Sequence, residues 1–470
     1  EYMSLIQYQL QPYFPKFAAA VSRQSPVERE QGRVAVVEFR DDGTSSTTSF
    51  HSSAELQSYL RKSLLQSPAG DAPRRRLFIL EDLPCNHILA LGSRLRIHPS
   101  FFAGHWDDPA NPTFNHRNPF VRFSKNQFRL RYATSARVEV DNPINPNTNV
   151  YAFNSNVCRY LHVYNPKGIL YDEARSHHTL SFWSSLARED GSWDAVLLVD
   201  PALGENVRYP PSMQVVRLPR ELKDENAMPK RFLFPEIDTL GELPDNCTEW
   251  SHISVQPKYY SMFDDAIGHF SGKDGTMRCD SAFDTTAFAR KLVIAHLVAF
   301  IRRRYLNLLT VQKNQHALRH NYLSDFTKSC FSTWNDNYYD FIVGTCAAMK
   351  EFSREIDDNL VALGLDSRES ARQWEVDGWK SVRETTRTVS KLADSFATSY
   401  LQYISIQEAR VSNSNAHSLS RITVLTMLFI PLSTVASIFS MGGDFLPGER
   451  KAWVFWVAAI PVIFVLAYLY

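Results

Sequence analysis

Hydroxyl side chains recur along one face of an apolar stretch near the end of the sequence. From Thr423 to Ser440 they return every three or four residues, with one isoleucine among them, which is the period of an α-helix. The face consists of Thr423, Thr426, Ile430, Ser433, Ser437 and Ser440. In lipid it should turn toward another helix or toward water, because hydrocarbon offers hydroxyl groups no hydrogen bonds. Two interpretations stay open: the hydroxyls pack against a helix or bond to their own backbone, or they line a pore.

Other residues with metal-binding or catalytic side chains match no established motif. The candidates are a His/Asp group (His98, His105, Asp107, Asp108, His116), a histidine pair (His316, His320), a basic cluster (Arg302, Arg303, Arg304) and an acidic run (Glu351, Glu355, Asp357, Asp358). Their spacing fits neither a zinc site nor a metalloprotease helix, so ordinary surface, capping and salt-bridge roles are the simpler interpretation. No phosphate-binding loop, dinucleotide fingerprint or nucleophile elbow occurs. The sequence therefore predicts neither an enzyme nor a bound cofactor.

Two long uncharged runs close the sequence. Residues 422–441 follow Arg421 without a charged side chain, and residues 452–470 form a second run of 19 residues. About 20 apolar residues in a helix span a hydrocarbon core about 30 Å thick. We therefore expect two transmembrane helices joined by a short extracytosolic loop, residues 442–451, with both flanking regions on one side. Arg410, Arg421 and the six scattered cysteines, which never fall at CxxC spacing, favour the cytosol for that side.

The overall charge and the ends of the sequence add limited information. The 470 residues carry 51 basic and 50 acidic side chains, so no net charge points to a nucleic acid partner. The first ten residues lack the basic start and apolar core of a secretory signal. Because the sequence begins with Glu1 and stops within an apolar run, we expect a longer protein to continue at both ends.

Proline divides the sequence into a mixed part and a helical part. Of the 24 prolines, 21 fall at or before Pro257, and none occurs in the following 173 residues. Because proline breaks helix interiors, we expect a cytosolic α/β domain at residues 1–257, its helical part at residues 258–366 and a long stalk helix at residues 367–421. With the terminal hairpin, the predicted fold class is an α+β membrane protein.

Short apolar or alternating runs predict the strands of the α/β domain. The expected strands are Arg76–Asp82, Val157–Tyr164, Ala195–Val199 and two antiparallel strands within Phe120–Val140, around a turn near Lys125 and Asn126. Residues 41–53 and 66–75 are polar or proline-rich, and we expect flexible segments there.

The predicted stalk carries an apolar stripe on one helical face. Its members are Trp379, Val382, Val389, Ala393, Phe396, Tyr400, Tyr403 and Ile406, with Thr386 in the one gap. An unbroken helix from Ser367 to Met441 would be roughly 110 Å long. The stripe either packs within one subunit or joins several subunits in a shared stalk.

The membrane segment resembles a known family of transporters. Leu425–Gly448 (LTMLFIPLSTVASIFSMGGDFLPG), followed directly by a second span, is similar to part of the CorA-like divalent metal-ion transporters. Pro431-Leu432-Ser433 matches a Pro-Leu-Thr step of that family, and Phe439-Ser440-Met441-Gly442 aligns with its Tyr-Gly-Met-Asn motif. Arg76–His105 also resembles the cytosolic domain of the fungal CorA-like branch.

The resemblance implies an assembly and a path for ions. It implies a homopentamer with a funnel-shaped cytosolic domain, whose first membrane helices surround a pore for magnesium or similar divalent cations. The implied partners are further copies of the chain, membrane lipid and divalent cations, in a multi-pass protein of the plasma membrane with both termini in the cytosol. The acidic run Glu351–Asp358 becomes a candidate for regulatory divalent ions. By position, the pore and selectivity residues would be Ile422, Thr426, Ile430, Ser433, Ser437, Ser440, Met441 and Gly442.

One position departs from the family motif. The family has asparagine where this sequence has Gly442, so the side-chain amide expected to hold a hydrated cation is missing. Asp444 and Glu449 at the pore mouth would attract cations, offset in part by Arg450 and Lys451. Two functions stay open: a passive divalent-cation channel with Ser-Met-Gly in place of Gly-Met-Asn, or a membrane-anchored scaffold or sensor that keeps the fold without transport.

Overall fold

The computed structural model of the chain describes residues 2–22, 32–65, 73–110, 125–138, 148–164, 172–203, 206–209, 214–217, 261–271, 281–321, 336–365, 373–440 and 450–469. They form two compact units. The first contains the described residues up to Asn321 and those from 336 to Asp394, and the second those from Ser395 onward.

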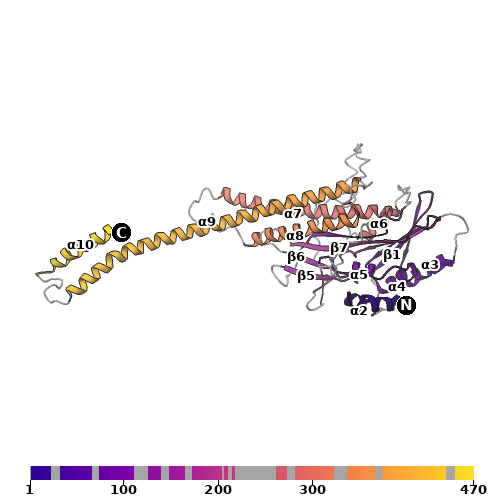
Figure 1. Ribbon diagram of the computed structural model, residues 1–470, viewed down its shortest axis with the longest axis horizontal. Helices are drawn as coiled ribbons and strands as arrows, with labels where there is room; N and C mark the ends of the chain where they lie inside the picture. The colour runs from indigo at the N-terminus through magenta and orange to yellow at the C-terminus, as the bar shows by residue number, and fades with distance from the viewer. Residues whose placement is uncertain are drawn as a thin grey trace. The chain divides into compact units, whose positions relative to one another are not determined.

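A ten-stranded mixed sheet organises the first unit (Figure 1). Its strands are β1 (Arg33–Phe39), β2 (Ser45–Phe50), β3 (Arg75–Glu81), β4 (Gln127–Val138), β5 (Thr148–Phe153), β6 (Tyr160–Tyr164), β7 (Asp172–Ser184), β8 (Trp193–Val199), β9 (Asn206–Tyr209) and β10 (Gln214–Arg217). They follow the order β10-β9-β5-β6-β7-β8-β3-β1-β2, and β4 pairs with β7 off this path. β3 and β8 pair in parallel, and both are buried along most of their length, as strands covered on both faces are.

The strand predictions are confirmed in most places. β3 and β8 coincide with the two apolar runs to within two residues, and only Tyr160–Tyr164 of the third run is a strand. A turn lies at Lys125 and Asn126, and the strand that follows it, β4, pairs along its whole length with β7. Residues 120–124, predicted to form the other arm of that hairpin, lie outside the described residues.

Residues 45–50 form strand β2, so the prediction of a flexible segment there is wrong. β2 pairs antiparallel with β1 through a tight turn. Gly43 adopts φ 80° in this turn, a left-handed conformation that suits glycine, and the Thr44 N–H donates to Asp42 Oδ1 at 2.8 Å. Asp-Gly between two extended runs is a hairpin signal, which the Ser/Thr-rich composition masked.

The sheet divides along strand β7. β4 occupies one edge of β7, from Gln127 opposite Trp183 to Val138 opposite Asp172. On the other edge β6 pairs with residues 173–176, and β8 pairs with residues 180–184. Residues 177–179 pair with neither β6 nor β8 in these ladders. Their buried backbone groups on that edge need other partners.

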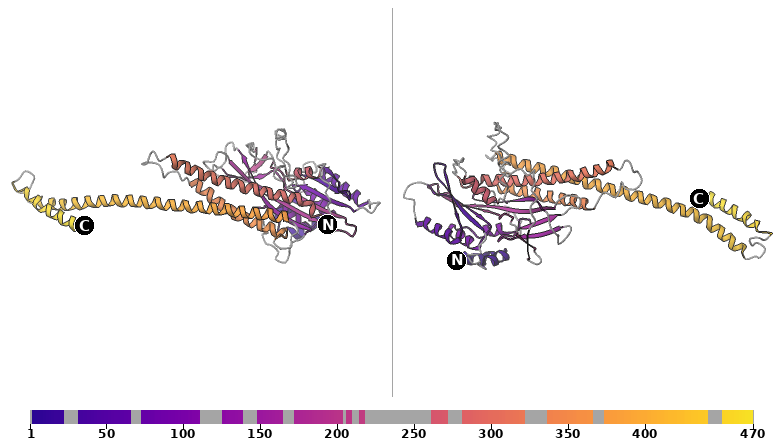
Figure 2. Two further views of the ribbon diagram at one scale, coloured as in Figure 1. Left: turned by 90° about the horizontal axis from the view of Figure 1, so that it is seen from above. Right: turned by 180° about the vertical axis from the view of Figure 1, so that it is seen from behind.

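Helices cover both faces of the sheet (Figures 1 and 2). One group comprises α1 (Tyr2–Leu5), a π-helical turn (Ile6–Leu10), α2 (Pro15–Ser22), α3 (Ser53–Leu65), α4 (Cys85–Leu95) and α5 (Ser100–Trp106). The other comprises α6 (Met262–Ser271), a 3₁₀ turn (Asp284–Thr286), α7 (Ala287–Asn321), α8 (Asp336–Ala362) and the start of α9 (Gln373–Phe439). The first group encloses a core that includes Phe17, Phe78, Leu91, Phe101 and Phe102.

The apolar stripe of α9 is buried over its first turns. Trp379, Val382, Val389 and Ala393 are 0% exposed, so this part of the stripe packs within the chain. Ile406, the last member of the stripe, is 53% exposed. The first interpretation, packing within one subunit, therefore holds for the start of the stripe, and the shared stalk stays a prediction for the exposed part.

The second unit contains the rest of α9 and helix α10 (Trp453–Leu469). Among the described helices, α9 is the one that is long and apolar enough to cross a membrane, and α10 contributes a shorter apolar helix, Trp453–Val465. Figures 1 and 2 show α10 returning beside the end of α9. The structure thus contains one candidate transmembrane helix near the C-terminus and a second, shorter apolar helix.

Candidate functional site

The last part of α9 leaves the predicted pore-facing residues exposed in the single chain. Ile422 and Ile430 are 58% and 59% exposed. The hydroxyl positions Thr426, Ser433, Ser437 and Ser440 are exposed as well. Met441 and Gly442 of the predicted selectivity motif, and Asp444 and Glu449 of the predicted pore mouth, lie outside the described residues.

Hydroxyl groups on this face bond to their own helix. Thr426 Oγ1 donates to the Ile422 carbonyl at 2.7 Å, and Ser440 Oγ donates to the Ser437 carbonyl at 2.9 Å. This is one of the two arrangements that the sequence left open. A hydroxyl that donates to its own backbone keeps its lone pairs, so the face still offers acceptors to water around a cation. Bonding of the hydroxyl groups to their own backbone is therefore compatible with a pore-lining face.

The few charges on the second half of α9 are sorted by face. Residues 395–440 contain one acidic residue, Glu408, and three basic ones, Arg410, His417 and Arg421. At about 100° per residue, the basic side chains lie about 180° to 220° around the helix axis from Glu408. Acid and base therefore occupy opposite faces.

Glu408 lies on the same face as the hydroxyl groups. It precedes Thr426 by 18 residues, which is about five whole turns of an α-helix. An open groove follows this face and is lined by Ile404, Glu408, Val411, Ser412, Asn415, Ala416 and Leu419. Polar oxygens and a carboxylate thus extend along one side of α9 before and within its apolar segment.

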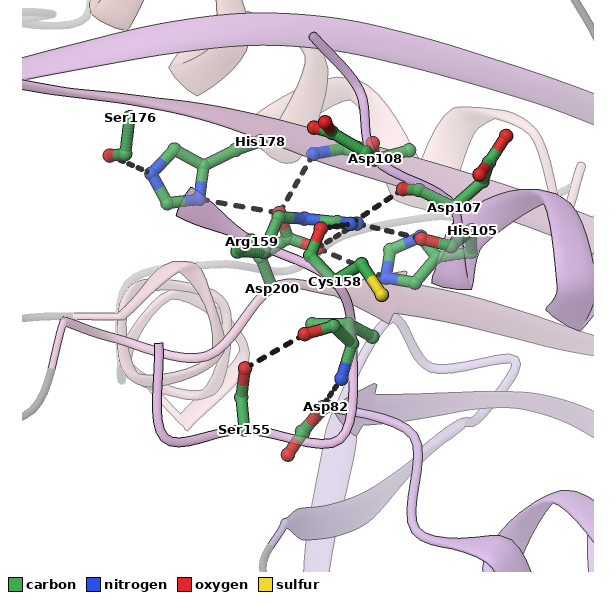
Figure 3. Close-up of polar contacts among 12 residues, drawn as sticks. Asp82, His105, Asp107, Asp108, Ser155, Cys158, Arg159, Ser176, His178 and Asp200 are labelled. Carbon is green, nitrogen blue, oxygen red and sulfur yellow. Dashed lines mark hydrogen bonds and ion pairs between the residues drawn. The ribbon is translucent and has the colours of Figure 1, made fainter. Parts of the chain in front are cut away.

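A second polar cluster lies inside the first unit, where the sheet divides (Figure 3). Arg159 precedes β6 and Asp200 follows β8, and their side chains are 0% and 1% exposed. The Arg159 guanidinium donates to both Asp200 carboxylate oxygens. It also donates to the backbone carbonyls of His105 and Asp107, and each of these two distances is 2.7 Å. The Thr179 N–H donates to Asp200 Oδ2 at 2.9 Å. The carboxylate therefore supplies the partner that the divided ladder lacks.

Burial and charge set the protonation of this cluster. Burial would raise the pKa of Asp200, but the Arg159 charge and hydrogen bonds from His105 and His178 hold it well below its ordinary value. Burial lowers the pKa of His105 to about 4, against the opposing effect of Asp200, and it also lowers the pKa of His178. Near neutral pH the cluster holds one carboxylate, one guanidinium and two neutral imidazoles. It is a buried structural ion pair rather than a ligand site.

Asp82, at the end of a neighbouring strand, also accepts hydrogen bonds from backbone N–H groups, as Asp200 does. It follows β3, the parallel neighbour of β8, and accepts hydrogen bonds from the Asn156 and Val157 N–H groups at 2.9 to 3.0 Å. Burial raises its pKa to about 6. Carboxyl ends of parallel strands often bind ligands, but here residues 155–159 occupy the position. In the sequence, an acidic residue directly after each of the buried strands β3 and β8 is the signal that points to Asp82 and Asp200. No sequence pattern points to the role of Arg159.

The His/Asp group predicted from the sequence does not converge on a metal. His105 is held by Asp200 at 3.2 Å, whereas His98 bonds Ser100 at 2.7 Å and Gln9 at 3.2 Å. His116 lies outside the described residues. Across the described segments, no three His, Cys, Asp or Glu side chains are placed to hold a metal ion.

The acidic run of α8 is paired within the chain. The pairs are Glu351 with Arg175 at 3.5 Å, Glu355 with His177 at 3.5 Å, Asp358 with Arg131 at 2.6 Å, and Asp357 with Arg383. These carboxylates fasten α8 to the sheet and to α9. Glu355 differs from the other three, because it is 2% exposed and neither of its carboxylate oxygens has a hydrogen-bond partner within the described residues. The expectation of an ordinary solvated surface is therefore wrong at Glu355.

Comparison with known families bears on the C-terminal segment. Residues 365–470 match the model of the family described as CorA-like Mg²⁺ transporter protein. The chain carries a CorA-like Mg²⁺ transporter domain at its C-terminus. That segment contains α9 and α10, and with them the hydroxyl face and the sorted charges.

The CorA-like domain confirms the family resemblance but not its branch. The match does not extend to Arg76–His105, so the fungal branch stays a prediction. A solved structure of the CorA magnesium transporter from Methanocaldococcus jannaschii aligns with 93% of this chain and 96% of that chain, at 10% identity and a TM-score of 0.37. A score this low does not establish a shared fold for the first unit. No curated protein matches the chain.

Proposed function

We propose that the chain is the subunit of a passive channel or transporter for Mg²⁺-like divalent cations. The sorting of charge on α9 carries this proposal, because a cation path is favoured by oxygen atoms and carboxylates and opposed by positive side chains. Glu408 and the hydroxyl groups lie on one face, and Arg410, His417 and Arg421 lie on the other. The match of residues 365–470 to the CorA-like family supports the same function.

The proposed pore is formed by a homopentamer in the plasma membrane, with the first unit in the cytosol. Hydrated cations would enter past Gly442 and follow Ser437 and Ser433. Ile430 and Ile422 would then form narrow apolar rings that close the path by dewetting. Helix α10 would be the second span of the hairpin, on the outside of the pore.

Ion flux into liposomes tests the proposal. The full chain, reconstituted with a trapped Mg²⁺-sensitive dye, should admit Mg²⁺ under an inward gradient faster than protein-free liposomes. Ser437→Leu places an apolar group on the proposed path and should slow the influx. Val435→Leu enlarges a side chain about 160° away around the helix and should leave it unchanged. Absence of divalent flux under every gradient and with every divalent ion would overturn the proposal.

The second candidate is a membrane-anchored scaffold or sensor, and Gly442 in place of asparagine favours it. Gly442→Asn separates the two candidates: a pore should change its selectivity among Mg²⁺, Co²⁺ and Ni²⁺, whereas a chain without a pore gains no flux. Native mass spectrometry of the purified protein gives the subunit number. A stable monomer or dimer could not enclose a pore of five helices.

A further inference from the structure

Arg421 marks the edge of the apolar segment of α9. It is the last charged residue before an uncharged stretch that continues to Ser440, where the description of this segment ends. About 20 helical residues cross about 30 Å of hydrocarbon, so Arg421 lies in the headgroup layer when residues 422–440 are in a bilayer. Residues up to seven positions earlier stay within about 10 Å of that layer along the helix.

Four side chains with hydrogen-bonding groups share one face at this edge. They are Ser414, His417, Ser418 and Arg421. Positions separated by three, four and seven residues are neighbours on a helix surface. All four side chains are exposed, and within the described part of the chain no hydrogen bond or ion pair engages them.

The chemistry of this face suits a phosphate group. A guanidinium offers planar N–H donors that match phosphate oxygens, and an imidazole and two hydroxyl groups add further donors. Glu408, the one acidic residue of α9 between residues 395 and 440, lies about 180° away from His417 around the helix. No carboxylate on this helix segment therefore competes for the donors.

The same face continues into apolar side chains on the membrane side. Val424 and Leu425 follow Arg421 by three and four residues and are 51% and 55% exposed. A ligand bound at Arg421 would thus meet donors toward the water and aliphatic groups toward the hydrocarbon. That division matches a phospholipid rather than a free phosphate ion.

We propose that Ser414, His417, Ser418 and Arg421 form a site for the phosphate group of an anionic phospholipid. The acyl chains of the lipid lie against Val424 and Leu425. The proposal needs α9 to cross a membrane, but it does not depend on ion conduction, so it can fail or stand separately from the proposed function.

Lipid retention by the detergent-purified full chain tests this site. Delipidated protein is titrated with phosphatidylglycerol and, separately, with phosphatidylcholine, and bound lipid is counted by native mass spectrometry. The wild type should retain phosphatidylglycerol at lower concentration than phosphatidylcholine. His417→Gln with Arg421→Gln should weaken phosphatidylglycerol retention by about fivefold or more, since the variant loses the guanidinium charge near the membrane surface and the imidazole contact with the phosphate. Ser414→Ala with Ser418→Ala should weaken it by a smaller factor.

A matched control removes two basic charges elsewhere on the same helix. Arg387 and Lys391 are also exposed and four residues apart, and their replacement by glutamine should leave lipid retention unchanged. Equal loss in this control would show a general charge effect and overturn the site. So would unchanged retention in either site variant, or displacement of the lipid by the same concentration of inorganic phosphate. A changed subunit number with lipid preference intact would assign the face to contacts between copies, again against the proposal.

Discussion

At the residue scale, the ion pair that closes the divided sheet should be costly to break. Asp200→Asn leaves the Arg159 guanidinium buried at 0% exposure without its countercharge. Removing one partner of a buried pair costs about 3–5 kcal/mol, and we expect the thermal unfolding midpoint of the full chain to fall accordingly. Glu189→Gln, at an exposed position in the loop before β8, serves as the control. Equal midpoints for the two variants would contradict the structural role of the pair.

Two buried groups should give the folded state opposite responses to acid. His105 has a pKa lowered to about 4, so the unfolded state binds more protons between about pH 6.5 and 4 and stability falls on acidification. Asp82 has a pKa raised to about 6, so the folded state binds more protons below that pH and stability rises. Each effect amounts to about 3 kcal/mol at most, and together they should largely cancel.

Single variants should separate these two responses. His105→Gln removes one acid-sensitive group, so its free energy of unfolding should fall less than that of the wild type, or rise, as the pH falls from 6.5 to 4. Asp82→Asn removes the opposing group, and its free energy of unfolding should fall over the same range. Denaturant titrations of the full chain at several pH values measure both slopes. Parallel pH profiles for the two variants would show that neither group titrates as its burial requires.

At the element scale, α8 protects an edge of the sheet. β4 has β7 on one side only, and Asn359 of α8 bonds its open side, accepting from the Arg131 N–H at 3.0 Å and donating to the Arg131 carbonyl at 2.7 Å. Asn359→Ala leaves two buried backbone groups unpaired, which should cost about 1–3 kcal/mol each. Faster amide exchange along β4 should accompany the loss. Lys350→Ala, on an exposed position of the same helix, should change neither quantity.

The elements differ in how far the sequence could predict them. β3 and β8 were predictable because both are fully covered, which makes their apolar runs continuous. The single long helix α9 was predictable from its unbroken stripe. β2 was not, because an edge strand with a Ser/Thr surface has the composition of a loop. The Arg159–Asp200 pair depends on β6 and β8 meeting at one point of β7, a long-range pairing that no local pattern records.

At the scale of the whole molecule, α9 belongs to two environments. Its first turns bury Trp379, Val382 and Val389 within the chain, whereas Leu401, Ile406 and most later apolar positions are exposed. An exposed helix rich in serine and asparagine, such as residues 411–420, has low intrinsic helix propensity. Membrane lipid and further copies of the chain are the surroundings that would cover it. The proposed pentamer supplies both.

In the proposed pentamer, one acidic residue of α9 would form a ring. Five copies of Glu408 around the axis would concentrate divalent cations at the cytosolic end of the path, an electrostatic effect that weakens as salt screens it. Glu408→Gln should therefore lower Mg²⁺ flux several-fold at low ionic strength and much less at high ionic strength. The flux assay in liposomes at the two salt concentrations measures this directly.

The position of the carboxylate on α9, rather than the net charge of the chain, should determine the Mg²⁺ flux. Adding Ser399→Glu to Glu408→Gln restores the net charge but places the acid nine residues earlier, about 180° around the helix from position 408. Because that face would turn away from the proposed path, the double variant should conduct like Glu408→Gln alone, whereas Glu408→Asp should retain most of the flux. Recovery of full flux in the double variant would mean that charge anywhere on the stalk suffices. That result would overturn the proposal that the hydroxyl face of α9 forms the wall of the pore.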